Sequence, residues 1–141
     1  MTLISVSSGN VSSTSEDVEG NQGPLVLAVD DHLDSLQLIT CAAELYGCRC
    51  ISTDNPSAVF SIAAAAKPKL ILLDILLPQM SGIEILQKLK QNAKTRSIPV
   101  VAVTALASER DRKQIMAAGF TSYLSKPYML EDLNSILALY L

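Results

Sequence analysis

Polar residues that can carry charge or hold a cation follow four of the short apolar runs in this chain. The acid pair Asp30-Asp31 follows the first run, Asp74 the third and Thr104 the fourth, and Lys126 lies just beyond the fifth. Three carboxylates close together repel one another, so at neutral pH the site must raise a pKa or recruit a cation. Mg²⁺ prefers oxygen ligands and is usually held by one or two carboxylates together with a phosphate. The sequence therefore predicts a Mg²⁺ site with Asp31 and Asp74 as direct ligands.

Asp74 has the most central position among these acids, and a carboxylate there can also act as a nucleophile that forms an aspartyl phosphate. Charge on the phosphoryl oxygens then needs fixed partners. Lys126 offers a compact positive charge and Thr104 a hydroxyl donor, so positioning and electrostatics would supply most of the catalysis, as phosphoryl transfer requires. An acid directly after Leu70-Ile71-Leu72-Leu73 is costly to bury, which favours a function for Asp74.

The apolar runs that precede these residues predict five β-strands, and the longer amphipathic stretches between them predict five helices. The predicted strands are Leu25 to Val29, Arg49 to Thr53, Leu70 to Leu73, Val100 to Val103, and Phe120 to Leu124. The predicted helices run from about His32 to Tyr46, Pro56 to Ala66, Gly82 to Gln91, Ser108 to Ala118, and Tyr128 to the end. Strands that alternate with helices indicate an α/β fold with a single doubly wound parallel sheet, whose ligands bind at the carboxyl ends of the strands.

The 141 residues, 49% of them hydrophobic, are enough for one domain with a buried core. Residues 1–23 are rich in Ser, Thr, Gly, Asn and acids and have almost nothing to bury. We therefore expect a flexible polar N-terminal tail followed by one domain over residues 24–141. The net charge of -3 leaves no excess of Lys and Arg, which disfavours nucleic acid and an anionic membrane as partners.

The cysteines and the histidine do not form a metal or disulfide motif. Cys41, Cys48 and Cys50 lack CxxC spacing, and His32 has no second imidazole with which to share a soft metal. We expect free thiols and interpret His32 as an ordinary residue of the first helical turn. The first residues lack the positive charges of a signal peptide, and no apolar run is long enough to cross a membrane. These features predict a soluble cytoplasmic protein.

The polar residues also form a family signature. Four features together resemble the receiver domain of two-component response regulators: Asp30-Asp31, Asp74 followed by Pro78 and Gly82, Thr104-Ala105, and Lys126-Pro127. The resemblance extends from Leu25 to the C-terminus. It implies a flavodoxin-like (βα)5 fold with strand order 2-1-3-4-5, and a switch that works by phosphorylation in a two-component phosphorelay. It also implies a cis peptide bond between Lys126 and Pro127.

The resemblance implies a chemical role for each matching residue. Asp74 is the expected phosphoryl acceptor, with a histidine kinase or a phosphotransfer protein as the donor. Asp30 is expected to hold the Mg²⁺ ion through water, and the backbone carbonyl of Leu76 is expected to be a further metal ligand. Lys126 is expected to pair with the phosphoryl group.

A conformational switch is also implied by the resemblance. Thr104 is expected to swing toward the phosphate and Tyr123 to follow by turning inward, which would change the surface of the fourth helix and fifth strand. The expected output is contact with a downstream protein target. We expect no enzymatic turnover of other molecules, only self-phosphorylation from phosphodonors and self-dephosphorylation. No output segment follows the last predicted helix, so a stand-alone regulator is the expectation.

The last predicted helix has more apolar residues than one core face needs. Four leucines form the predicted core stripe, Leu130, Leu133, Leu137 and Leu141. Ile136 and Leu139 remain for another face, where they are either scattered exposed side chains or a partner contact. We hypothesise weak homodimerisation favoured by phosphorylation, through the fourth helix, fifth strand and fifth helix.

Other functions fit parts of the pattern. A flavodoxin-like electron carrier shares the sheet, but Asp30-Asp31 would repel a flavin phosphate after the first strand. The main alternative is a receiver-like interaction module that works without phosphorylation, although loss of Asp74, Lys126 or one of the acid pair would mark that class. A phosphatase acting on other molecules is disfavoured, because no second acid stands two residues after Asp74. Each polar residue alone is more often structural, and their joint order along the strands favours a site.

Overall fold

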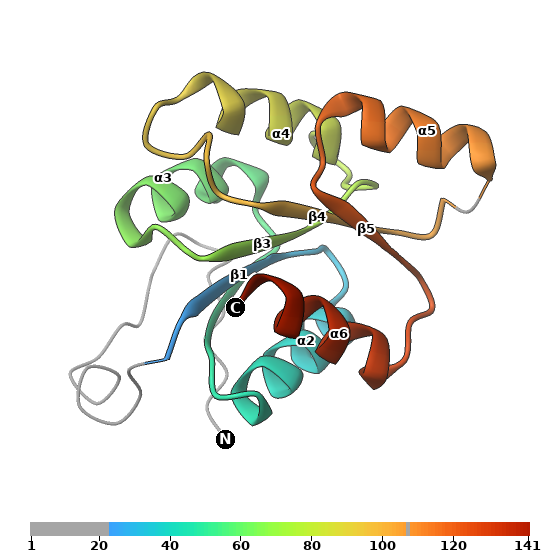
Figure 1. Ribbon diagram of the computed structural model, residues 1–141. Helices are drawn as coiled ribbons and strands as arrows, with labels where there is room; N and C mark the ends of the chain where they lie inside the picture. Colours follow the sequence, from blue (N-terminus) through green and yellow to red (C-terminus); the bar gives the residue numbers. More distant parts are fainter. Residues whose placement is uncertain (1–22, 107) are drawn as a thin grey trace.

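The computed structural model describes residues 23–106 and 108–141, over which five strands alternate with five helices (Figure 1). The strands are β1 (Leu25–Val29), β2 (Arg49–Thr53), β3 (Leu70–Asp74), β4 (Val100–Thr104) and β5 (Ser122–Ser125). The helices are α2 (Leu33–Leu45), α3 (Pro56–Ala66), α4 (Gly82–Gln91), α5 (Glu109–Ala118) and α6 (Leu130–Tyr140). The α/β fold predicted from the sequence is confirmed. The expected tail lies, except for Gly23, outside the described residues.

The five strands form one parallel sheet in the order β2-β1-β3-β4-β5, which is the order that the family resemblance implies. In the middle of the sheet, Val26 of β1 pairs with Leu70 of β3, and Ile71 of β3 pairs with Val100 of β4. Every residue of β1, β3 and β4 is buried. Strands covered on both faces need apolar side chains on both faces, which explains their unbroken apolar runs.

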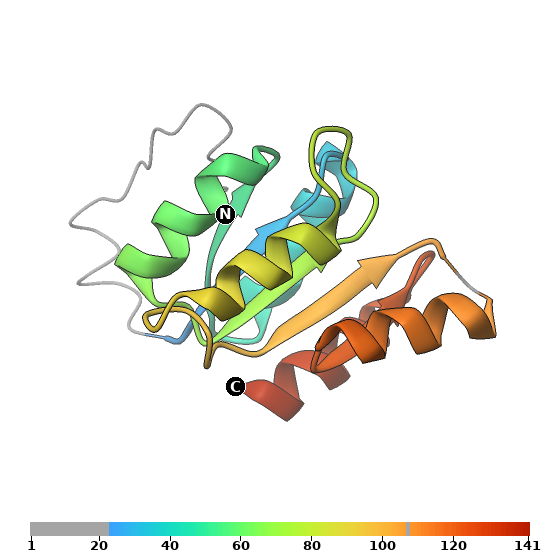
Figure 2. The same cartoon turned by 90° about the horizontal axis from the view of Figure 1, so that it is seen from above.

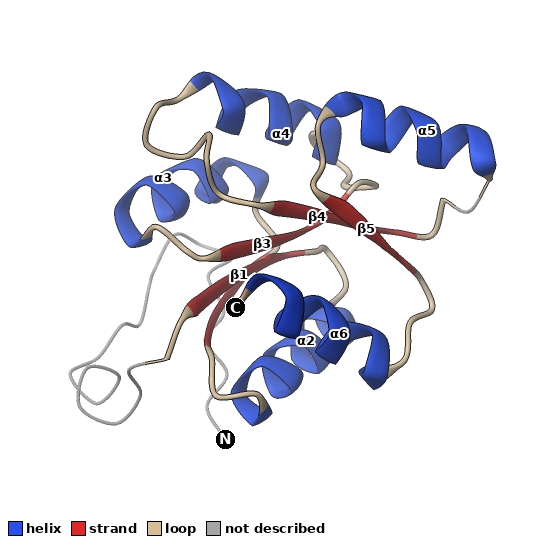
Figure 3. Ribbon diagram, viewed as in Figure 1, coloured by secondary structure: helices blue, strands red, loops and turns tan. Residues whose placement is uncertain are grey.

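Helices cover both faces of this sheet. α3, α4 and α5 lie on one face, and α2 and α6 lie on the other (Figure 1, Figure 2). Successive strand residues point to opposite faces, so Ile71 and Leu73 join the core beneath α3, α4 and α5, whereas Leu70 and Leu72 join the core beneath α2 and α6. Figure 3 shows the strands as the middle layer between the two helix layers. No helix in the described part of the chain is both long and apolar enough to span a membrane.

β5 begins at Ser122, two residues later than the sequence predicts. Phe120 is buried in the core but precedes the ladder, because pairing with β4 begins at Ser122 opposite Val101. Thr121 closes the end of the sheet instead. Its N–H donates to the Val100 carbonyl at 2.9 Å, and its hydroxyl accepts from the Val100 N–H at 3.2 Å. A buried apolar residue just before a strand is therefore easily predicted as part of the strand, although it makes no ladder pair.

Helix α6 begins at Leu130, two residues after its predicted start, and its core face is shorter than predicted. Leu133 and Leu137 are buried as expected, and Leu139 is exposed on the other face. Ile136, which was predicted for that face too, is instead partly buried and packs against the core. Leu130 is 42% exposed, so the predicted core stripe is wrong at this position. Leu130 is the first residue of the helix and is not among the side chains that pack against the core beneath α2 and α6.

The start of α4 is held close to the end of β3. The Ser81 hydroxyl caps the helix by accepting from the Glu84 N–H at 3.2 Å. The Gly82 N–H donates to the Ile75 carbonyl at 2.9 Å. A Cβ atom on Gly82 would lie 2.6 Å from the Asp74 carbonyl oxygen and 2.8 Å from Ile75 Cα. Glycine is therefore needed here for the loop after Asp74 to close against the helix.

Candidate functional site

Four strand ends meet at one edge of the sheet and bring polar groups into the fold. Asp30 follows β1, Asp74 ends β3, Thr104 ends β4, and Lys126 follows β5. Asp30 is 1% exposed, Asp74 2% and Thr104 0%. Buried carboxylates need partners, because transfer of an isolated charge from water into the protein is very costly. The contacts of these side chains therefore decide what the site can do.

Lys126 supplies the cationic partner of two buried acids. Its Nζ atom lies 2.8 Å from Asp30 Oδ2 and 3.2 Å from Asp74 Oδ2. Its backbone N–H donates to the Thr104 carbonyl at 2.8 Å, which ties the end of β5 to the end of β4. The peptide bond that follows, Lys126-Pro127, is cis, as the resemblance implies. One ammonium therefore lies between the ends of β1, β3 and β5.

These neighbours shift the protonation of all three groups. Burial, and after it the charge of Asp30, raises the pKa of Asp74 to about 6, even though the Leu76 N–H and Lys126 favour its ionised form. Burial also acts to raise the pKa of Asp30, but hydrogen bonds from Lys126 and the His32 backbone outweigh it, and the pKa is lowered. Burial acts to lower the pKa of Lys126, and the bond to Asp30 and the charges of both aspartates raise it. An added cation next to Asp74 would favour its ionised form.

The other carboxylate oxygen of Asp74 is held by the loop that follows β3. The Leu76 N–H donates to Asp74 Oδ1 at 3.0 Å. The Leu76 side chain is exposed, so the residue presents its backbone to the site and its side chain to the surface. The structure thus places the Leu76 backbone beside Asp74. The role of its carbonyl as a metal ligand stays a prediction.

Asp31 and His32 lie beside this buried group, at the start of α2. His32 is the residue before the helix, so the interpretation of His32 as a first-turn residue is wrong by one position. Its Nδ1 atom lies 3.1 Å from Asp30 Oδ1 and 3.1 Å from Asp31 Oδ1, and its backbone N–H donates to Asp30 Oδ1 at 2.9 Å. A single histidine gives no spacing pattern to indicate this contact. Its place directly after an acid pair at a strand end is the signal that could have found it.

The donor atoms in this region are close enough to share a cation. Ligand atoms of Asp30, Asp31, His32 and Asp74 lie within 4.8 Å of one another. The three carboxylates of Asp30, Asp31 and Asp74 carry more negative charge, if all are ionised, than the Lys126 ammonium that contacts two of them can offset. Carboxylate oxygens are the ligands that hard divalent cations prefer. The residues present therefore fit a divalent metal ion.

Thr104 and Tyr123 lie on the two strands at the β5 side of the site. The Thr104 hydroxyl accepts from the Leu106 N–H at 3.1 Å. Tyr123 is half-buried on β5, and the Arg112 guanidinium lies over its ring, 4.8 Å from the ring centroid. Thr104 is the last residue of β4, whereas Tyr123 pairs with Ala102 in the middle of that strand. Their roles in a conformational switch stay predictions.

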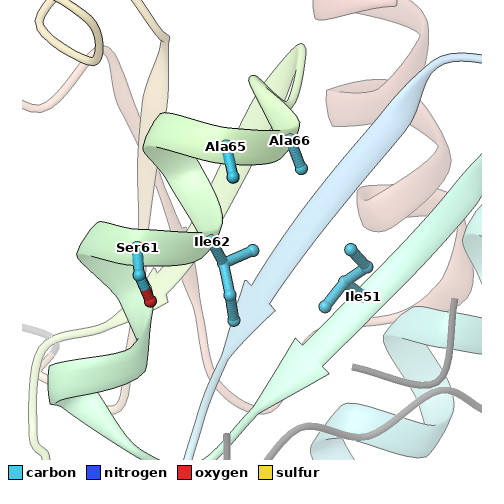
Figure 4. A pocket seen from close by; sticks show the side chains of 5 residues that line it. All are labelled: Ile51, Ser61, Ile62, Ala65 and Ala66. Atoms are coloured by element: carbon cyan, nitrogen blue, oxygen red, sulfur yellow. The ribbon is translucent and has the colours of Figure 1, made fainter. Parts of the chain in front are cut away.

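Two hollows in the described surface differ in their chemistry. One of about 430 Å³ lies between β2 and α3 and is lined by Ile51, Ser61, Ile62, Ala65 and Ala66 (Figure 4). These residues carry no charge, so that hollow offers no carboxylate for a hard cation and no ammonium for a phosphoryl group. The other, of about 380 Å³, is lined by Asp34, Ser35, Leu38, Ala105, Lys126, Pro127 and Tyr128. This second hollow borders the site through Lys126, whereas Asp30, Asp31 and Asp74 do not line it.

Comparison with known proteins agrees with this geometry. Residues 26–138 match the family model described as response regulator receiver domain. The phosphate regulon transcriptional regulatory protein PhoB of Pseudomonas aeruginosa is 34% identical over 111 residues, 79% of this chain and 48% of that protein. The chain thus spans about half the length of this relative. The polar-differentiation response regulator DivK of Brucella anthropi is 38% identical over 102 residues, 72% of this chain and 83% of that protein.

One solved structure with the same fold contains a bound metal ion. The receiver domain of the sensor histidine kinase PA1611 from Pseudomonas aeruginosa superposes with a TM-score of 0.76 at 26% identity. The match covers 84% of this chain and 97% of that domain, whose structure has a magnesium ion coordinated in the active-site cleft. Three observations agree: the family match over most of the chain, the strand order, and the acid cluster with its lysine. This chain belongs to the family of response-regulator receiver domains of two-component signalling.

Proposed function

We propose that the chain is a phospho-accepting response regulator of a phosphorelay, in which Mg²⁺-dependent phosphorylation of Asp74 switches a protein-interaction surface. The observation that carries this proposal is the position of Lys126, whose ammonium contacts both Asp30 and Asp74. The carboxylate proposed as the nucleophile, the ammonium and a cluster of possible metal ligands lie together at the carboxyl ends of the strands, which supports the proposal. Phosphoryl transfer depends mainly on such positioning and electrostatic stabilisation.

The proposed reaction transfers a phosphoryl group from a phosphohistidine. An oxygen of the Asp74 carboxylate bonds to phosphorus, the phosphorus–nitrogen bond of the donor breaks, and the donor imidazole leaves and takes up a proton. Asp74 must be ionised to attack, and its raised pKa works against that form. A cation between Asp74 and Asp31 would counter this effect, and the Lys126 ammonium would pair with the phosphoryl oxygens of the product.

The proposed metal is Mg²⁺, with Asp31 and Asp74 as direct ligands, Asp30 acting through water, and the Leu76 carbonyl as a further ligand. When bound, Mg²⁺ supplies positive charge to the phosphoryl oxygens. The oxygen-rich donor set and the close approach of its members support this assignment. The magnesium ion in the cleft of the PA1611 receiver domain supports it as well.

The proposed phosphoryl donor is a histidine kinase or a phosphotransfer protein. The hollow that Lys126 lines supports this, because it leaves open space at the margin of the site where a donor protein could approach. Phosphorylation would draw Thr104 toward the phosphate and turn Tyr123 inward. The surface formed by α5 and β5 would then change, and a downstream protein target would recognise the new surface.

We also propose that phosphorylation favours weak homodimerisation through α5, β5 and α6. Exposed Met116 on α5 and exposed Leu130 and Leu139 on α6 supply apolar surface for such a contact. A phosphoryl mimic should then shift the chain to an earlier elution volume in size-exclusion chromatography. Equal elution volumes with and without the mimic would count against the dimer.

Chemical mapping of the acceptor tests the proposed function. The chain is incubated with acetyl phosphate, which the proposed self-phosphorylation would use, and then reduced with borohydride, which converts an aspartyl phosphate to homoserine. We expect homoserine at position 74 in the peptide mass map and unmodified aspartate at Asp30 and Asp31. Homoserine at Asp30 or Asp31 in place of Asp74 would refute the assignment.

A further inference from the structure

His32, the one histidine of the chain, faces the acid cluster from the start of α2. Its side chain is 67% exposed, so the ring lies at the open side of the site. Its Nδ1 atom nevertheless turns toward the acids and lies 3.1 Å from a carboxylate oxygen of both Asp30 and Asp31. The backbone N–H of His32 donates to Asp30 at 2.9 Å, which fixes the residue beside a buried carboxylate.

The spacing of these atoms is that of neighbouring ligands around one cation. An octahedral ion with ligand distances of about 2.1 Å places adjacent ligand atoms about 3.0 Å apart. The separation of 3.1 Å between His32 Nδ1 and Asp31 Oδ1 fits this edge. Asp74 is part of the same group, whose ligand atoms all lie within 4.8 Å of one another. A metal held by Asp31 and Asp74 would therefore have the His32 nitrogen within its reach.

An imidazole changes which ions such a site favours. Mg²⁺ prefers oxygen ligands and loses its water reluctantly, whereas later first-row divalent ions accept imidazole nitrogen. We propose that His32 is a ligand of the divalent cation and raises the affinity of the site for Mn²⁺ and Co²⁺ relative to Mg²⁺. This inference rests on the metal site of the proposed function and adds a specificity-determining residue to it.

If His32 only pairs with the two acids and does not bind the metal, the opposite effect of its removal on metal affinity is expected. If His32 is protonated and simply pairs with Asp30 and Asp31, it competes with any cation for those oxygens. Its removal would then strengthen the binding of Mg²⁺, Mn²⁺ and Co²⁺ alike. Ligation by His32 predicts instead that its removal weakens Co²⁺ and Mn²⁺ binding and leaves Mg²⁺ binding nearly unchanged.

Metal titration of the untagged full chain separates these two outcomes. Calorimetric titrations with Co²⁺ and with Mg²⁺ are compared for the wild type and His32→Gln. We expect the variant to lose about tenfold in Co²⁺ affinity, the scale on which removal of a single group around a metal acts. Asp34→Asn is the matched control, because it removes a charge from the first turn of α2. It should lower both affinities by a similar factor and leave their ratio unchanged.

A spectroscopic readout identifies the ligand directly. Pulsed electron paramagnetic resonance of bound Mn²⁺ reports coupling to a ligand nitrogen. Because the chain has one histidine, an imidazole signal can come only from His32. The coupling should be present in the wild type, change on labelling histidine with ¹⁵N, and vanish in His32→Gln. Mn²⁺ bound at the acids without nitrogen coupling would overturn the role of His32 and leave the proposed metal site standing, whereas absence of any divalent binding would overturn both.

Discussion

Lys126 Nζ lies 2.8 Å from Asp30 Oδ2, although the two residues are 96 positions apart in the sequence. The contact joins the end of β1 to the end of β5, with β3 and β4 between them in the sheet. The same ammonium also reaches Asp74 at the end of β3. The charge of this one side chain therefore affects the protonation of two buried acids.

The raised pKa of Asp74 predicts that the metal-free chain loses stability as pH rises. The folded state keeps the proton up to about pH 6, whereas the unfolded carboxyl releases it near 3.8. Between these values the folded state binds more protons, so the free energy of unfolding falls with rising pH, by on the order of 3 kcal/mol. Asp74→Asn should remove this decline, and the exposed Asp54→Asn should keep it. Urea unfolding in a chelator at several pH values measures how the free energy of unfolding depends on pH. An equal decline with rising pH in the wild type and in Asp74→Asn would contradict the prediction.

Loss of the shared ammonium should destabilise the fold until a metal replaces it. Lys126→Met should lower the free energy of unfolding of the metal-free chain by about 2 kcal/mol, less than for a fully buried pair because the lysine side chain is 18% exposed. Added Mg²⁺ should restore more stability in this variant than in the wild type. Lys113→Met, on the exposed side of α5, is the control and should change little. A Lys126→Met chain as stable as the wild type in chelator would argue against the shared role.

The close approach of Gly82 to Asp74 predicts a steric effect on the site. Gly82→Ala brings a Cβ atom to 2.6 Å from the Asp74 carbonyl oxygen, so the loop after β3 must move. We expect a destabilisation of about 2 kcal/mol and weaker Mg²⁺ binding. Ser81→Ala should cost about 1 kcal/mol through the lost helix cap while leaving Mg²⁺ affinity unchanged. Unfolding and Mg²⁺ titration of both variants check this, and unaltered Mg²⁺ binding in Gly82→Ala would contradict it.

The contact between Arg112 and Tyr123 predicts an effect on activation. If Tyr123 turns inward on phosphorylation, the guanidinium contact over its ring is lost, which costs about 0.5–1 kcal/mol at an exposed site. Arg112→Ala should then bind beryllium fluoride, a phosphoryl mimic, about two- to fivefold more tightly. Arg110→Ala on the same helix is the control. When Tyr123 is replaced by leucine, Arg112→Ala should no longer increase the affinity for beryllium fluoride. An increase that persists in the Tyr123→Leu background would exclude the ring contact as its cause.

The central strands and the buried site residues were predictable because burial leaves a strong pattern. The runs that became β1, β3 and β4 are apolar on both faces, and their predicted bounds hold to within one residue. The carboxyl ends of parallel strands meet at one edge, so the proximity of Asp30, Asp74 and Lys126 follows from strand order. The predicted start of β5 was wrong because Phe120, although buried, lies in the connection between α5 and β5 and not in the strand.

Contacts that depend on side-chain direction could not be predicted in the same way. The place of His32 against Asp30 and Asp31 follows from where α2 begins, and a shift of one residue changes which way the ring points. The stacking of Arg112 on Tyr123 depends on how α5 packs beside β5. Leu130 has the spacing of a core residue, but it lies at the first position of α6 and stays partly exposed. Periodicity alone does not contain this information.

The intact mass of the chain after incubation with acetyl phosphate tests the central claim most directly. The wild type and Asp74→Asn are each incubated with and without Mg²⁺. We predict one added phosphoryl group in the wild type with Mg²⁺, and none without the metal or in Asp74→Asn. No adduct on a folded, metal-loaded wild type, or an undiminished adduct on Asp74→Asn, would contradict the account.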